Sequence, residues 1–182
     1  MKRNIIYILC TLFALCSCTM VASRIPIGEA PVVLDAKEWD GTWFNPGGDY
    51  CVMKVKNEKE GVLRLSWFEN DKEMTYKSGD VFIKKSGNWL FASIKADDEK
   101  DATETVYAWA IIKKNKKIIL IWLPNEERFK KLIEAKTLPG VVKKDMIVLG
   151  DLKPEHMKII VSEERSLLFD WEDPLVLIKL SD

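Results

Sequence analysis

Side chains that commonly carry catalysis are scarce in this sequence. His156 is its single histidine, and it stands beside Glu155 at the start of an expected helix, away from that helix's apolar residues. No serine occupies a Gly-x-Ser-x-Gly motif, the sharp turn that exposes the nucleophile of many hydrolases. We therefore expect His156 to be a surface residue rather than a general base, and we expect no catalytic site and no enzymatic activity.

Metal, cofactor and nucleic-acid sites have equally little support. The acidic run from Asp97 to Asp101 is interrupted by Lys100 and lacks the glycine turn that calcium loops usually contain. The chain has 28 basic and 28 acidic residues, whereas proteins that capture nucleic acid generally carry a strong positive charge. The sequence therefore predicts no metal, no cofactor and no nucleic-acid partner.

The amino terminus has the pattern of an export signal. Lys2 and Arg3 precede an apolar run from Ile5 to Cys16. This run is shorter than the roughly 20 apolar residues that span a bilayer. A basic start followed by a short apolar run is typical of a secretory signal.

The residues after this run point to a lipid anchor. Leu15-Cys16-Ser17-Cys18 resembles the bacterial lipobox, in which a leucine lies three residues before the modified cysteine and a small residue directly precedes it. The resemblance implies a signal peptide over 1–17 and acyl chains such as palmitate on Cys18. It also implies a place in the bacterial cell envelope, and the absence of an acidic residue at Thr19 favours the periplasmic side of the outer membrane. The alternative is a plain secretory signal that is cut after Ser23.

Removal of the signal would leave Cys51 as the one free thiol, because Cys10 and Cys16 are lost and Cys18 is modified. No disulfide within the chain would then be possible. Cys51 lies in an apolar run, so we expect a buried, unreactive side chain. The alternative is a reactive thiol.

The mature chain divides into a short linker and one domain. Residues 19–37 contain Pro26, Gly28 and Pro31 and show neither a helical nor an alternating pattern. We expect a lipid-anchored tether over 18–38 and a single β-rich domain over 39–182. Within the domain, short alternating or apolar runs separated by turns predict strands at 50–56, 63–67, 81–84, 89–95, 103–112, 118–123 and 175–180.

The segment 106–123 is apolar on both faces of its expected strands, although its central lysines exclude a membrane span. A second layer must therefore cover this hairpin. Asn125 is a good N-cap, and Phe129, Leu132 and Ile133 form an apolar stripe on the helix that would follow it. We expect this helix to be the cover, with a second helix beginning near Pro154.

Gly41-Thr42-Trp43 is similar to the glycine–any–tryptophan signature that opens lipocalin barrels, in which the tryptophan packs across the closed end. The chain also resembles small bacterial lipoproteins as a group. The predicted fold is mainly β: an antiparallel meander or barrel, lipocalin-like, with two short helices inserted before the last strand. An open β-sandwich is the alternative.

A barrel of about eight strands is either filled by its own side chains or just wide enough for one small ligand. Trp67, Ala92, Ala108 and Ala110 are the candidate cavity residues, because small side chains beside an aromatic ring leave space. We expect a membrane-anchored, non-catalytic binding module for a small apolar ligand. The alternative is an envelope structural or protein-interaction lipoprotein with a filled core.

Overall fold

Strands outnumber helices in the described part of the chain. The computed structural model describes residues 20–68, 76–96, 105–143, 146–162 and 168–181. The strands in chain order are β1 (Met20–Ser23), β2 (Ala30–Pro31), β3 (Gly41–Asn45), β4 (Asp49–Asn57), β5 (Val62–Phe68), β6 (Tyr76–Ser86), β7 (Trp89–Ala96), β8 (Val106–Lys114), β9 (Ile118–Trp122), β10 (Gly140–Val142), β11 (Met146–Leu149) and β12 (Leu175–Ser181). The helices are α2 (Ala36–Trp39), α3 (Glu126–Glu134) and α4 (Pro154–Ile160). Of the helices in these ranges, none has the length and apolar character needed to cross a membrane.

Eight antiparallel strands close into a barrel. Their order is β8-β7-β6-β5-β4-β3-β12-β9, and β9 pairs back to β8 from Ile111↔Trp122 to Lys114↔Ile119. This pairing leaves no open edge between the first and last strands of the series. The predicted mainly β barrel is confirmed, and the closure excludes the open sandwich.

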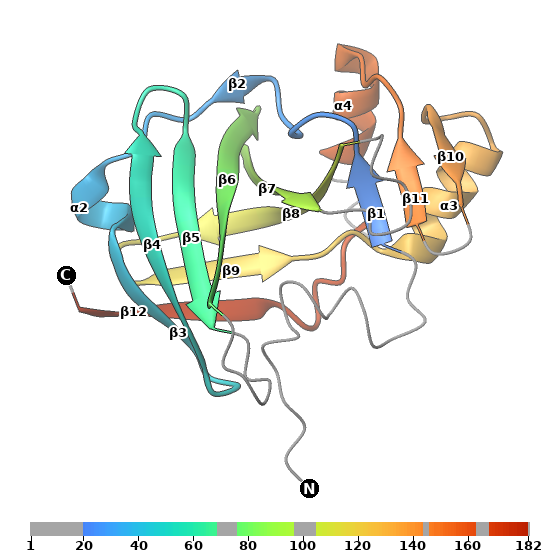
Figure 1. Cartoon of the computed structure of the whole chain (residues 1–182). Coiled ribbons are helices and arrows are strands. Elements are labelled where there is room, and N and C mark those ends of the chain that lie inside the picture. The colour runs from blue at the N-terminus through green and yellow to red at the C-terminus, as the bar shows by residue number, and fades with distance from the viewer. Residues whose placement is uncertain (1–19, 69–75, 97–104, 144–145, 163–167, 182) are drawn as a thin grey trace, which may run out of the picture.

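The sheet forks at β8. The carboxyl-terminal half of β8 pairs with β9, whereas Tyr107 and Ala108 pair with Ser23 and Ala22 of β1. Strand β11 continues the sheet parallel to β1, and β10 follows antiparallel to β11. In Figure 1 the barrel lies on the left, and this extension lies on the right with α3 and α4.

Helices α3 and α4 cover the outer face of β8, as the apolar character of both faces predicts. The ring of Trp109 lies 5.6 Å from that of Phe129 in α3 and 5.9 Å from that of Phe169. Met157 and Ile160 of α4 belong to the same buried cluster. Asn125 caps α3 as predicted, because its side chain accepts a hydrogen bond from the Arg128 N–H.

The amino-terminal segment differs from the predicted tether, since residues 20–38 belong to the folded body. Ala22 of β1 has no exposed surface, and Ile27 and Leu34 are also buried. Gly28 brings the chain against β6: its φ is 115°, and a Cβ there would lie 2.6 Å from Cβ of Lys84. A short strand buried on both faces has no alternation to reveal it, and this is why the pattern of the sequence resembled a linker.

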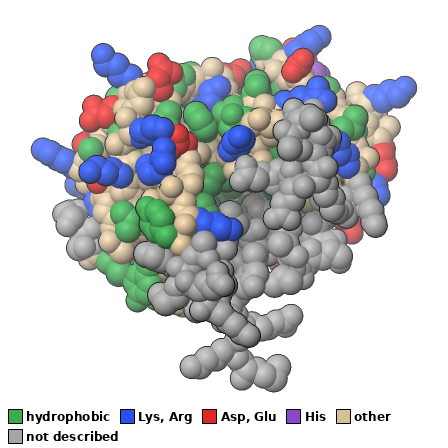
Figure 2. Space-filling model, viewed as in Figure 1, with side chains coloured by type: hydrophobic (Ala, Val, Ile, Leu, Met, Phe, Trp, Pro, Cys, Tyr) green, Lys and Arg blue, Asp and Glu red, His purple; other side chains and the backbone are tan. Residues whose placement is uncertain are grey.

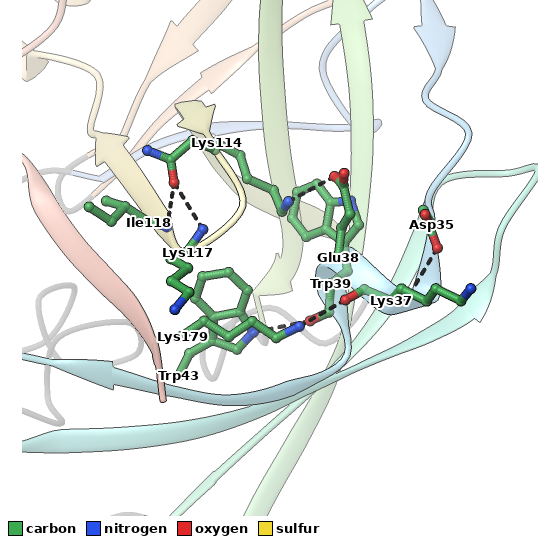
Figure 3. Close-up of polar contacts among 10 residues, drawn as sticks. Asp35, Lys37, Glu38, Trp39, Trp43, Lys114, Lys117, Ile118 and Lys179 are labelled. Carbon is green, nitrogen blue, oxygen red and sulfur yellow. Dashed lines mark hydrogen bonds and ion pairs between the residues drawn. The ribbon is translucent and has the colours of Figure 1, made fainter. Parts of the chain in front are cut away.

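One end of the barrel is plugged by α2 (Figure 3). The fully buried Trp43 donates a hydrogen bond from Nε1 to the carbonyl oxygen of Trp39, at 3.0 Å. Nζ of Lys179 donates to the Lys37 carbonyl oxygen at 2.9 Å. Lys114 pairs with Glu38 of α2, and its Nζ lies 4.9 Å from the centre of the Trp39 ring. These contacts join α2 to β3, β8 and β12 and shut this end of the interior.

Candidate functional site

The barrel interior contains a cavity of about 120 Å³. Its walls come from α2 and from all eight strands of the barrel, and the side chains that line it are almost all apolar. The lining residues are Trp39, Asn45, Asp49, Tyr50, Cys51, Met53, Leu63, Leu65, Trp67, Val81, Ile83, Ala92, Ile112, Ile119, Ile121 and Leu177. The volume is close to that of the engineered apolar cavity of about 150 Å³ that holds benzene or xenon. It is well below the roughly 300–1,000 Å³ of pockets for drug-sized ligands.

A small residue on β7 leaves this space. Ala92 lies directly opposite Ile83 on one side and Ala110 on the other, so a methyl group stands where most wall positions carry a longer chain. Trp67 on β5 supplies a large ring to the same wall. The cavity is therefore bordered by the large indole ring of Trp67 and by the small methyl side chain of Ala92.

Two of the four predicted cavity residues line the cavity. Trp67 and Ala92 are in its wall. Ala108 and Ala110 are buried but do not line it. Ala108 pairs with Ala22 of β1, past the point at which β9 closes the barrel, so it belongs to the wall of the fork instead.

Polar lining residues gather at one end of the cavity, which we call the hairpin end and define by Asn45, Asp49 and Tyr50. These residues flank the turn between β3 and β4, at the opposite end of β3 from α2. Oδ1 of Asn45 accepts a hydrogen bond from the Gly47 N–H at 2.7 Å. Sequence reasoning missed all three; the alternation of Cys51 and Met53, extended back by two residues, would have placed Asp49 on the inner face.

Asp49 is the one acidic group among the described residues of this wall. Its Oδ2 atom is shielded from solvent and has no hydrogen-bond partner in the described part of the chain. Desolvation by burial raises the pKa of the carboxyl group above its ordinary value. On the neighbouring strand Nε1 of Trp67 is also buried without a partner.

Cys51 lines the cavity beside these groups. It is a free thiol, and burial raises its pKa to about 12. The nucleophilic form of cysteine is the thiolate, and at neutral pH this thiol is protonated. Its place in the wall fits the predicted hydrophobic role better than a reactive one.

The remaining candidates do not join this site. Nδ1 of His156 accepts a hydrogen bond from the Lys153 N–H at 3.0 Å, at the start of α4. In the described ranges no three His, Cys, Asp or Glu side chains are placed to hold a metal ion. Cys18 and the acidic run 97–101 lie outside the described residues.

Comparisons with known proteins assign the chain to no family. No model of a protein family, no curated protein and no solved structure matches it.

Proposed function

We propose that this protein is a membrane-anchored, exported lipoprotein whose barrel binds a small apolar molecule without chemical change to it. The observation that carries the proposal is the apolar cavity of about 120 Å³ inside the barrel. A void of this kind costs stability, because its lining atoms lose van der Waals contacts that a filled core would make. An apolar molecule that enters it restores those contacts and leaves water.

The size of the cavity sets the size of the ligand. A molecule with the bulk of a benzene ring fits, whereas a long acyl chain would require the walls to move. Few atoms are buried, so the expected affinity is weak, with a dissociation constant of about a millimolar, or about −4 kcal/mol. Such an affinity suits a carrier or sensor that releases its ligand readily.

The proposed anchor would hold the barrel close to the membrane. Strand β1 begins at Met20, two residues after the proposed lipidation site Cys18. Two residues of extended chain span at most about 7 Å. A lipidated Cys18 would thus fix the folded body directly at the bilayer surface, where apolar molecules concentrate.

Calorimetric titration with toluene tests the proposed binding. We expect saturable binding to the wild-type protein and none to Ala92→Leu, which adds bulk inside the cavity. Ser66→Leu is the control, because Ser66 alternates with the lining residues Leu65 and Trp67 and so faces the outer wall. Absence of saturable toluene binding by a folded wild-type protein, or equal binding by Ala92→Leu, would contradict the proposal.

The outer wall of the barrel supports a second candidate function, that of a protein-interaction lipoprotein. Val52 of β4 and Leu180 of β12 are 50% and 53% exposed. Tyr50 borders the cavity only at its hairpin end, and it alternates with Asp49 and Cys51, so its ring is 55% exposed on the same outer surface. The Tyr50 ring lies 5.0 Å from that of Phe44 on the intervening strand β3. Figure 2 shows hydrophobic side chains on the surface near the β3–β4 hairpin, at the lower left. Such patches often mark sites of association.

A photo-crosslinking residue at position 52 tests this candidate in cells. If the outer wall binds a protein, crosslinking at Val52 gives a discrete product of higher mass that the same residue at the exposed Lys59 does not give. Identical patterns from the two positions would contradict it.

A further inference from the structure

Two polar atoms in the cavity wall have no hydrogen-bond partner among the residues that the structure describes. They are Oδ2 of Asp49 and Nε1 of Trp67, both shielded from solvent. A carboxylate oxygen accepts hydrogen bonds, whereas an indole N–H only donates them. Buried polar groups in native proteins nearly always form hydrogen bonds, so a buried group without one requires an explanation. A ligand that completes these hydrogen bonds would account for both atoms.

The strand register places the two side chains on one stretch of the inner wall. Trp67 lies directly opposite Cys51 in the β4–β5 pair. Asp49 precedes Cys51 by two residues, so its side chain points to the same face of the sheet. Asp49 and Trp67 are therefore diagonal neighbours, which in antiparallel pairs lie about 7–8 Å apart. Both residues line the cavity, so a polar group bound at its hairpin end would lie near both side chains.

The charge of the cavity wall determines which polar end group of a ligand it can accommodate. Asp49 is acidic, and no lysine, arginine or histidine is among the described residues that line the cavity. The raised pKa of the Asp49 carboxyl follows from desolvation without a compensating cation. A ligand carboxylate placed there would meet a like charge and no basic partner. A hydroxyl or ammonium group would instead donate to Asp49, and a hydroxyl oxygen would also accept from Trp67.

We infer that the cavity takes a small amphipathic molecule: an apolar body of about the size of a benzene ring, with a hydroxyl or amine end group that donates a hydrogen bond to Asp49. This inference rests on the proposed function and specifies its ligand class. Under this inference, carboxylates such as fatty acids do not bind with their acid group at the hairpin end. Trp67 adds a second contact for hydroxyl groups alone, because an ammonium group has no lone pair to accept the indole N–H.

A set of four probes with one ring and different end groups tests the inference. Toluene, benzyl alcohol, benzylamine and benzoate are titrated against the protein at neutral pH, and binding is followed by NMR chemical shifts. We expect benzyl alcohol and benzylamine to bind about tenfold or more tightly than toluene. Benzoate should bind more weakly than toluene.

Two substitutions test whether the preference for hydroxyl and amine end groups depends on Asp49 and Trp67. Toluene has no polar end group, so its affinity for each variant reports any change in cavity shape. In Asp49→Asn, benzylamine should lose its advantage over toluene and benzoate should bind about as well as toluene. In Trp67→Phe, benzyl alcohol should lose affinity relative to toluene, whereas benzylamine should not. Glu58→Gln, an exposed change in the β4–β5 turn near the α2 end, should alter none of the ratios.

The outcomes separate this inference from the proposed function. If toluene binds but the four probes show no order that depends on Asp49, the inference is wrong and the binding function stands. If benzoate binds best to the wild-type protein, the inference is also wrong. If no probe binds, toluene included, the proposed function itself fails.

Discussion

Asp49, Cys51 and Trp67 are the residues that give the barrel wall its chemical character. Asp49 and Trp67 carry buried polar atoms without partners, and Cys51 lies directly opposite Trp67. The same burial that raises the pKa of Asp49 raises that of Cys51. All three side chains line one apolar space, and the pKa values of Asp49 and Cys51 depend on how far water is excluded from it.

The Cys51 thiol links folding to alkaline pH. Its folded pKa of about 12 lies above the ordinary value of 9.0, so the folded state holds the proton more tightly than the unfolded state. The resulting stabilisation is complete below about pH 9 and is lost as the pH rises toward 12. Between these values the free energy of unfolding of the wild-type protein should fall more steeply than that of Cys51→Ala.

Denaturant unfolding of both proteins over this pH range measures the difference. Lysine and tyrosine side chains titrate in both proteins, so their effects cancel in the comparison. Parallel pH dependences would show that the thiol is as well solvated in the folded state as in the unfolded one.

At the scale of elements, the sequence predicts those helices and strands whose capping residues and apolar patterns lie within one segment of the chain. Asn125 and the stripe through Phe129 predict α3 because capping and helical periodicity lie within one segment. The two apolar faces of β8 predict a covering layer for the same reason. Strands β1, β10 and β11 have four residues or fewer, too few for an alternating pattern. Strand β1 in addition pairs only with residues more than 80 positions away, such as Ala108 opposite Ala22.

The cavity was predictable only in part. Alternation identifies the inner face of each strand, and it placed Trp67 and Ala92 there correctly. Whether an inner residue borders a void depends on its neighbours across two strands and on where the barrel closes. Ala108 and Ala92 are alike in sequence terms, but β1 rather than β9 lies beside Ala108. Local patterns contain no information about that fork.

Strand β1 offers a test of how the amino-terminal segment contributes to folding. Ala22→Asp would place a charge at a position with no exposed surface, between β8 and β11. The substitution should cost several kcal/mol of stability. Val33→Asp is the matched control, because Val33 is 75% exposed in the same segment and should change stability by about 0.5 kcal/mol or less. Equal thermal midpoints for the two variants would mean that residues 20–38 are a tether after all.

At the scale of the whole molecule, the proposed lipid anchor would hold the barrel at the membrane surface. The anchor proposal predicts that cells expressing the protein incorporate a radioactive fatty acid into it and that Cys18→Ala abolishes the label. The control Cys16→Ala keeps Leu15, Ser17 and Cys18 in place and should remain labelled. Label that persists in Cys18→Ala, or is absent from the wild-type protein, would remove the membrane anchor from the account.

The central claim is that the barrel is hollow, and a crystal of the wild-type protein under xenon pressure tests it most directly. Xenon enters dry apolar cavities of this size and scatters strongly. The account predicts a xenon atom inside the barrel, in contact with Leu65, Val81 and Ala92. A barrel interior without xenon, in crystals that bind xenon elsewhere or diffract unchanged, would show that the side chains fill the space and would contradict the account.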